Sequence, residues 1–137
     1  MADVHQMRPK AESEKITINL GFIDLGKIDL LVGDGFFSNR TDFIRTAIRN
    51  QLERHRDAAD KSVVRRQLDL GLSHFSREQL EAVREAGETL EIKVLGLATI
   101  APDVSPELAR ATIASLTVLG ALHAGAAMKS ALADRIT

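Results

Sequence analysis

The chain contains no cysteine, no tryptophan and no tyrosine among its 137 residues. Without cysteine it cannot form a disulfide, a thiolate metal site or a cysteine nucleophile, and this composition fits a reducing compartment such as the cytoplasm. The absence of tryptophan and tyrosine removes side chains that commonly stack on bases, which argues against a platform for single-stranded nucleic acid.

Long apolar runs are also missing. The first fifteen residues, MADVHQMRPKAESEK, contain no apolar segment of the signal-peptide type. Residues 113–128 are rich in small apolar side chains, but polar residues interrupt them and they fall short of the roughly 20 residues that a membrane span needs. We therefore expect a cytoplasmic protein with no membrane partner.

The sequence shows no pattern that carries catalysis or holds a cofactor. There is no GxSxG motif and no phosphate-binding glycine loop, and Gly33-Asp34-Gly35 reads as a turn. We predict no catalytic residue, no metal ligand, no cofactor and no enzymatic activity. Four histidines share no close spacing with one another or with carboxylates: His5, His55, His74 and His123. His74 and His123 both fall near predicted strand ends and could meet in space, although ordinary strand-end histidines are the commoner outcome.

Charge is distributed unevenly along the chain. Residues 1–66 hold 12 Lys and Arg against 10 Asp and Glu, whereas residues 67–137 hold 6 against 9. This asymmetry favours two functional halves, the first with a weakly basic face, although a solvated charged helix face is the commoner explanation of such an excess of basic residues.

The stretch KITINL, residues 15–20, alternates between polar and apolar side chains. A period of two predicts a strand with one apolar and one polar face. One short strand is not stable alone in water, so it needs a partner.

Two helices are predicted after this strand. Apolar residues at helical spacing indicate a first helix of about two and a half turns, with Asp24 as its N-cap and Gly33 as its stop. Asn39, followed three residues later by Asp42, predicts the capped start of a second helix. Its apolar stripe is Phe43, Ile44, Ala47, Ile48 and Leu52, while Arg45 and Arg49 are expected on a solvated face.

A strand and two helices within about forty residues cannot bury their own apolar faces. A symmetric dimer solves this, because the strand can pair antiparallel with its copy and four helices can cover one side of the ribbon. The predicted dimer core is Ile16, Ile18, Leu20, Phe43, Ile44 and Ile48. Lys15, Thr17 and Asn19 would then stand on the open side of a two-stranded ribbon, which fits the major groove of B-DNA.

These stretches, KITINL and IDLLVGDGFFSNRTDFIRTAIRNQL, resemble the ribbon-helix-helix DNA-binding family of the CopG/Arc/MetJ type over residues 15 to about 55. The resemblance implies double-stranded DNA as partner and a homodimer. It implies that Lys15, Thr17 and Asn19 read bases and that Ser38, Asn39 and Arg40 bind phosphate. The chain departs from the family where Phe22-Ile23-Asp24-Leu25 replaces a proline and an acidic residue, so the start of the first helix is open.

The second half contains a repeat. Residues 92–109 align with 116–133 at a constant offset of 24, and residues 68–87 form a degenerate earlier copy. Ser76 and Ser105, the latter followed by proline, predict helix starts. Each unit therefore reads as strand, turn and short helix, and such units stack into a small right-handed parallel-strand solenoid. Two VLG tripeptides could also recur by chance. We recognise no family for this half.

The expected fold is α+β, a ribbon-helix-helix domain followed by a solenoid-like repeat domain. The predicted parts are a flexible arm (1–14), the DNA-binding domain (15–56), a linker or helix extension (57–66) and an oligomerisation domain (67–137). Open strand edges and an apolar last unit favour self-association. Three functions fit: a transcriptional repressor associated with the nucleoid, an antitoxin that also binds its own promoter, or a DNA-anchored structural or segregation protein that polymerises.

Overall fold

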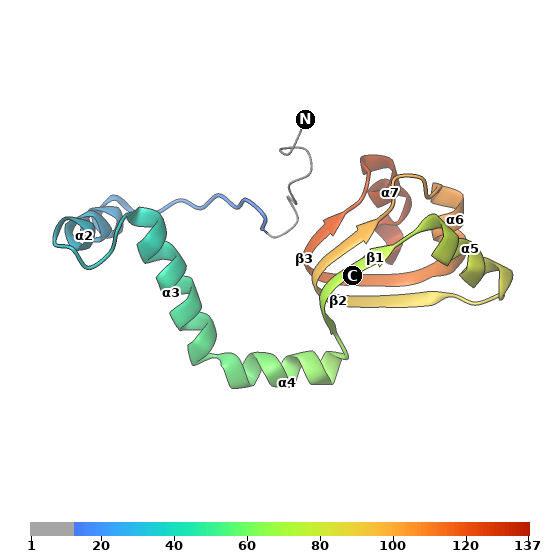
Figure 1. The fold of residues 1–137 in the computed structure, drawn as a ribbon, viewed down its shortest axis with the longest axis horizontal. Helices are drawn as coiled ribbons and strands as arrows, with labels where there is room; N and C mark the ends of the chain where they lie inside the picture. Colours follow the sequence, from blue (N-terminus) through green and yellow to red (C-terminus); the bar gives the residue numbers. More distant parts are fainter. Residues whose placement is uncertain (1–12) are drawn as a thin grey trace, which may run out of the picture. The chain divides into compact units, whose positions relative to one another are not determined.

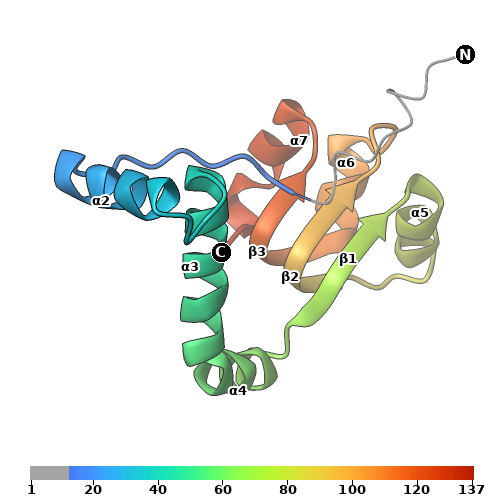
Figure 2. The ribbon, with the colours of Figure 1, turned by 60° about the vertical axis from the view of Figure 1, so that its left-hand side comes forward.

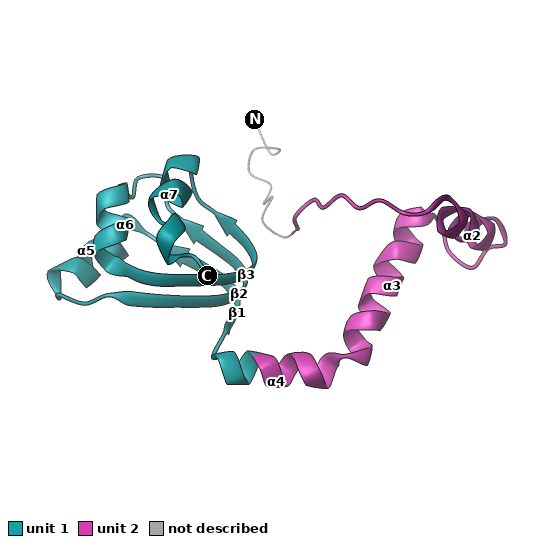
Figure 3. Ribbon diagram, turned by 180° about the vertical axis from the view of Figure 1, so that it is seen from behind, with its two compact units in different colours: residues 1–12, 63–137 teal, residues 13–62 magenta. Residues whose placement is uncertain are grey.

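The computed structural model describes residues 13–137, which form two compact units, residues 13–62 and residues 63–137 (Figure 3). The N-terminal arm predicted for residues 1–14 lies almost wholly outside the described residues.

The first unit contains two helices joined by a tight turn, α2 (Phe22–Gly33) and α3 (Arg40–Arg54) (Figure 1). Residues 13–20 belong to no helix and no sheet of the described single chain. The pairing of the predicted strand with a second copy therefore stays a prediction. After His55 the chain forms a separate helix, α4 (Arg56–Arg66), of which no residue is buried. The stretch expected as a linker or a helix extension is thus helical.

Helix α2 begins earlier than the sequence predicted and ends at the predicted residue, Gly33. Its N-cap is Gly21, which contributes no side-chain hydrogen bond, and Asp24 lies within the first turn. Asp24 as N-cap was therefore wrong, although an acidic residue there still complements the helix dipole. The helix ends at Gly33 with Asp34 as its C-cap, and Gly35 follows with a φ of +88°. The N–H groups of Gly35 and Phe36 donate to carbonyls of the last turn, a Schellman ending that needs a left-handed residue. Gly33 as the end of the helix is confirmed.

The second unit is a three-stranded parallel sheet with helices along one face (Figure 2). The strand order is β1-β2-β3, and each strand is followed by a short helix. The elements are β1 (Asp69–Phe75), α5 (Arg77–Glu85), β2 (Leu90–Ile100), α6 (Pro106–Thr112), β3 (Ile113–His123), α7 (Ala126–Ala131) and the 3-10 helix η1 (Ala133–Arg135).

The strand register follows the predicted offset. Val94 pairs with Val118 and Gly96 with Gly120, both 24 residues apart, and β2 and β3 are parallel as predicted. The pairs between β1 and β2 are 25 residues apart. The helices do not keep this offset, because their N-caps, Ser105 and Gly125, are only 20 residues apart. The turn after β3 is shorter than the turn after β2, so the repeat is regular in its strands alone.

The core lies between one face of the sheet and the helices. Side chains at alternate positions of β2 and β3 pack against the helices, whose starts at Ser76 and Ser105 are capped as predicted. The buried cluster is Leu80, Ile92, Val94, Ala98, Ile100, Val104, Leu108, Ala109, Ile113, Leu116, Met128 and Leu132.

Three glycines lie side by side across the sheet. Gly71 pairs with Gly96 and Gly96 with Gly120, and all three have a positive φ, between 114° and 139°. A Cβ atom on Gly96 would collide with the carbonyl oxygen of Gly71, and one on Gly120 with that of Gly96. The strands therefore approach each other closely at Gly96 and Gly120, where only glycine fits.

Candidate nucleic-acid interface

Residues 15–20 expose both their faces in the single chain. Ile16 is 73% exposed, Ile18 59% and Leu20 38%, and the alternating Lys15, Thr17 and Asn19 are exposed as well. Apolar side chains of this size are rarely left open together unless another surface covers them.

The apolar stripe of α3 is also incompletely covered. Phe43 and Ile44 are half-buried, while Ile48 is 47% and Leu52 65% exposed. Helix α3 has no buried residue, and α2 has one, Ile28. All six residues predicted as a dimer core thus keep solvent-accessible surface in the single chain, so a second chain has apolar surface to cover.

The start of α3 has the predicted cap. The Asn39 side chain accepts a hydrogen bond from the Asp42 N–H at 2.8 Å, and the Asp42 carboxylate accepts one from the Ser38 N–H at 2.9 Å. The rings of Phe37 and Phe43 meet edge to face, with centroids 5.0 Å apart. The turn before the helix is therefore fixed by both polar and aromatic contacts.

This cap changes what the helix start offers to a phosphate. The Ser38 N–H and the Asn39 side chain are already hydrogen-bonded inside the chain. The N–H groups of Arg40 and Thr41 belong to the first turn, where an α-helix provides no carbonyl partner. These two amides, with the positive end of the helix dipole, are the backbone groups at this helix start that could accept an anion as hydrogen-bond partner.

Arg40 forms an ion pair that the sequence did not reveal. Its Nε and Nη2 atoms each donate a 2.8 Å hydrogen bond to one carboxylate oxygen of Asp29, in helix α2. These hydrogen bonds lower the pKa of Asp29 and raise that of Arg40. The residues are eleven positions apart, outside the spacing of any local helix pair. The pair joins α2 to the start of α3.

The two histidines that could have met near the strand ends lie on different strands with β2 between them. Register places His74, Thr99 and His123 in one row across the three strands, so that a threonine separates the two rings. The His74 Nδ1 atom lies 2.5 Å from the Thr99 hydroxyl oxygen. Among residues 13–137, no cluster of three or more histidine or carboxylate side chains could hold a metal ion.

No helix within residues 13–137 is both long and apolar enough to cross a membrane.

Comparison with known proteins gives one match. The family model described as Ribbon-Helix-Helix transcriptional regulator family matches residues 11–129, which cover both structural units almost completely. No curated protein and no solved structure matches the chain.

Proposed function

Because the chain belongs to the ribbon-helix-helix transcriptional regulator family, we propose that it is a repressor that reads the DNA major groove with a dimeric β-ribbon. Membership makes it a DNA-binding transcriptional regulator. The proposal adds the dimeric ribbon, the residues that read the operator, and self-assembly through residues 67–137.

The open apolar face of residues 15–20 carries the proposal. Ile16 and Ile18 are more than half exposed in the single chain, and the apolar stripe of α3 in the same unit is also partly open. Antiparallel pairing of this segment with its copy would cover both surfaces at once. It would also fix Lys15, Thr17 and Asn19 on the outer face of the ribbon, where ammonium, hydroxyl and amide groups match base edges.

Phosphate binding is proposed at the start of α3. The free amides of Arg40 and Thr41 supply donors, and the Arg40 guanidinium, 54% exposed, supplies charge. Ser38 and Asn39 fix the turn through the helix cap. In this proposal they do not contact the phosphate themselves.

The test is to sequence the genomic DNA that the purified protein binds, and then to compare wild type with the triple variant K15A/T17A/N19A on the best site. We expect the variant to fold and dimerise, since these side chains are exposed, but to lose discrimination by about 1–3 kcal/mol for each base that the strand no longer reads. Equal affinity of both proteins for the best site would refute base reading by this strand.

A second function, a DNA-anchored structural or segregation protein, is favoured by one observation. Within residues 13–137, no strand pairs with the outer edge of β1, and the outer edge of β3 is largely uncovered. A repressor would form a limited assembly on adjacent operator sites, whereas a structural protein would form long polymers without DNA. Electron microscopy of the purified protein separates the two. No observation on the described residues favours the antitoxin.

A further inference from the structure

The glycine row of the sheet is complete on one side and open on the other. Gly96 and Gly120 each leave room for the carbonyl oxygen of the preceding glycine. Gly71 has the same left-handed backbone, with φ of +114°, yet no atom of the described chain lies within 4 Å of the position of its missing Cβ. Gly71 is thus shaped for a strand that the single chain does not supply.

The leucine rows on the sheet face that points away from the helices show the same incompleteness. Leu97, in the middle of its row, is only 9% exposed because Leu72 and Ala121 flank it. Leu72, at the β1 edge of the same row, is 68% exposed, and Leu70 in the neighbouring row is 70% exposed. A further strand beside β1 would cover the open flank of both.

The β3 edge has an open segment of matching length. The C-terminal residues cover its beginning, because Ile136 bridges to Leu116 and the Thr137 N–H donates to the Leu116 carbonyl. Beyond Thr117 no described strand pairs with this edge, which leaves Val118–His123 open. Strand β1, Asp69–Phe75, has seven residues, so six of them fit this stretch and the seventh falls beside Ala124.

We propose that β1 of one copy adds in parallel to β3 of a second copy, in the register that β1 and β2 continue. Leu119 would then face Leu70 of the next copy, and Gly120 would face its Gly71, so that the Gly120 carbonyl fills the open space. Because the two edges differ, this contact is head to tail and leaves a free edge at each end of a joined pair, so dimers would join into assemblies larger than a dimer. The proposal supplies a surface for the self-assembly proposed above and does not depend on DNA binding.

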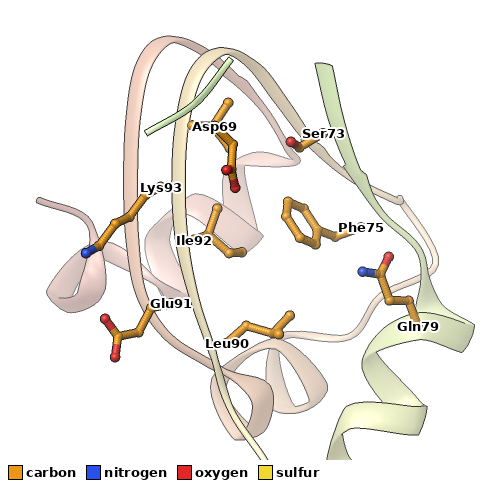
Figure 4. Close-up of a pocket in the computed structure, with 9 residues that line it drawn as sticks. Asp69, Ser73, Phe75, Gln79, Leu90, Glu91, Ile92 and Lys93 are labelled. Carbon is orange, nitrogen blue, oxygen red and sulfur yellow. The ribbon is translucent and has the colours of Figure 1, made fainter. Parts of the chain in front are cut away.

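The side chains on the helix-covered face of the sheet also support this junction. At the β3 end, Val118, Leu122 and Ala124 are only partly buried, and at the β1 end Phe75 is partly buried. Next to β1 lies a hollow of about 190 Å³ in which Asp69, Ser73 and Phe75 of β1 face Leu90 and Ile92 of β2 (Figure 4). The core is therefore unfinished at its first strand, where the next copy would extend it.

One residue opposes the junction. Asp69 points into this hollow, where Phe75, Leu90 and Ile92 also lie, and its proposed neighbour is Val118 of the adjoining copy (Figure 4). A carboxylate at an edge strand limits uncontrolled pairing, because burying its charge is costly. We expect D69N to strengthen assembly, lowering the concentration at which oligomers larger than a dimer appear by at least tenfold. The unfolding transition of D69N should match that of wild type, which would show that the stronger assembly does not come from misfolding.

Cysteine cross-linking tests the register directly, since the natural chain has no cysteine. In L70C/L119C the two cysteines of one chain are two strands apart, about 10 Å, too far for a disulfide. Mild oxidation without DNA should instead link neighbouring copies into a ladder of dimers, trimers and larger species on non-reducing gels. The matched control L72C/L119C displaces one partner by two residues on the same sheet face and should cross-link at least fivefold more slowly.

Three outcomes would overturn the proposal. The first is an absence of trimers and larger species from oxidised L70C/L119C that remains folded by circular dichroism. The second is equal cross-linking of the displaced pair. The third is efficient dimer formation by L70C alone, which would indicate β1 pairing with its own copy. Failure of the cross-links with intact operator binding would reject this junction and leave the DNA-binding function standing.

Discussion

Arg40 is held by Asp29, and this pairing determines how the arginine can act on DNA. Both partners are about half exposed, and an exposed ion pair contributes little to stability. A DNA phosphate can therefore compete with Asp29 for the guanidinium. The carboxylate would then lie close to the DNA backbone and weaken binding, so the pair positions Arg40 at a cost in affinity.

Salt dependence separates these contributions. R40A should reduce the slope of log K against log salt by about 0.9 for each phosphate that the protein no longer neutralises, and should weaken all DNA sequences alike. D29N should keep the slope and raise the affinity, because Arg40 no longer has an internal competitor. D24N, which removes a second carboxylate of α2, controls for net charge, and R49A controls for removal of any arginine of α3. An R40A slope equal to that of R49A would rule out phosphate binding by Arg40.

The protonation of Asp134 is coupled to folding of the second unit. Arg110 donates hydrogen bonds to its carboxylate, one of them at 2.9 Å, and lowers its pKa. A carboxylate with a lowered pKa in the folded state stabilises the protein above its unfolded pKa of about 3.9. That stabilisation disappears as the pH falls through the lower, folded value.

Urea unfolding at several pH values tests this coupling. D134N should be less stable than wild type at pH 6, and the difference should shrink as the pH is lowered below about 4. E88Q removes an exposed carboxylate of the same unit for which no described ion pair exists, and should show no such convergence. A wild-type to D134N difference that stays constant from pH 6 to pH 3 would contradict the prediction.

At the scale of elements, the sheet depends on backbone contact between its strands. Gly96 and Gly71 have similar positive φ angles but different surroundings, since the Gly71 carbonyl oxygen occupies the place of a Cβ at Gly96 and nothing occupies it at Gly71. G71A should therefore cost only backbone strain, about 1–2 kcal/mol. G96A adds a collision with a neighbouring backbone.

Chemical unfolding at low protein concentration, where assembly is absent, compares the two variants. G96A should lose about 3 kcal/mol or more, or fail to form the sheet, because backbone cannot move aside as a side chain can. The loss of unfolding free energy in G96A minus that in G71A measures the cost of the collision, because the backbone strain is common to both variants. Equal losses would show that the collision is relieved at little cost.

The sequence predicted the elements whose signals are local. Asn39 and Asp42 marked the start of α3, and the spacing of Gly96 and Gly120 gave the register of β2 and β3. The start of α2 was missed because Gly21 caps it without a side-chain signal. The Asp29–Arg40 pair was missed because it depends on how two helices pack. The 24-residue offset predicted for the helices was wrong. The length of each turn determines where the next helix begins, and the strand pattern does not constrain that length.

At the scale of the whole molecule, the proposals assign DNA binding to one unit and assembly to the other. The first holds the proposed ribbon and phosphate site, and the second holds two different strand edges. Joining dimers through those edges would place several ribbons on one DNA molecule. Binding to one operator site would then favour occupation of the next, since linked sites act at high effective concentration.

Truncation tests this division. A chain lacking residues 67–137 should remain a dimer and bind a single operator with nearly unchanged affinity, because the proposed ribbon and α3 lie within residues 13–62. It should lose cooperativity on tandem operators and all species larger than a dimer in light scattering. L119K, a change at a residue 42% exposed on β3, should have the same effect in a folded full-length chain. If full-length and truncated proteins both scatter as simple dimers and bind tandem sites alike, the second unit does not assemble the first.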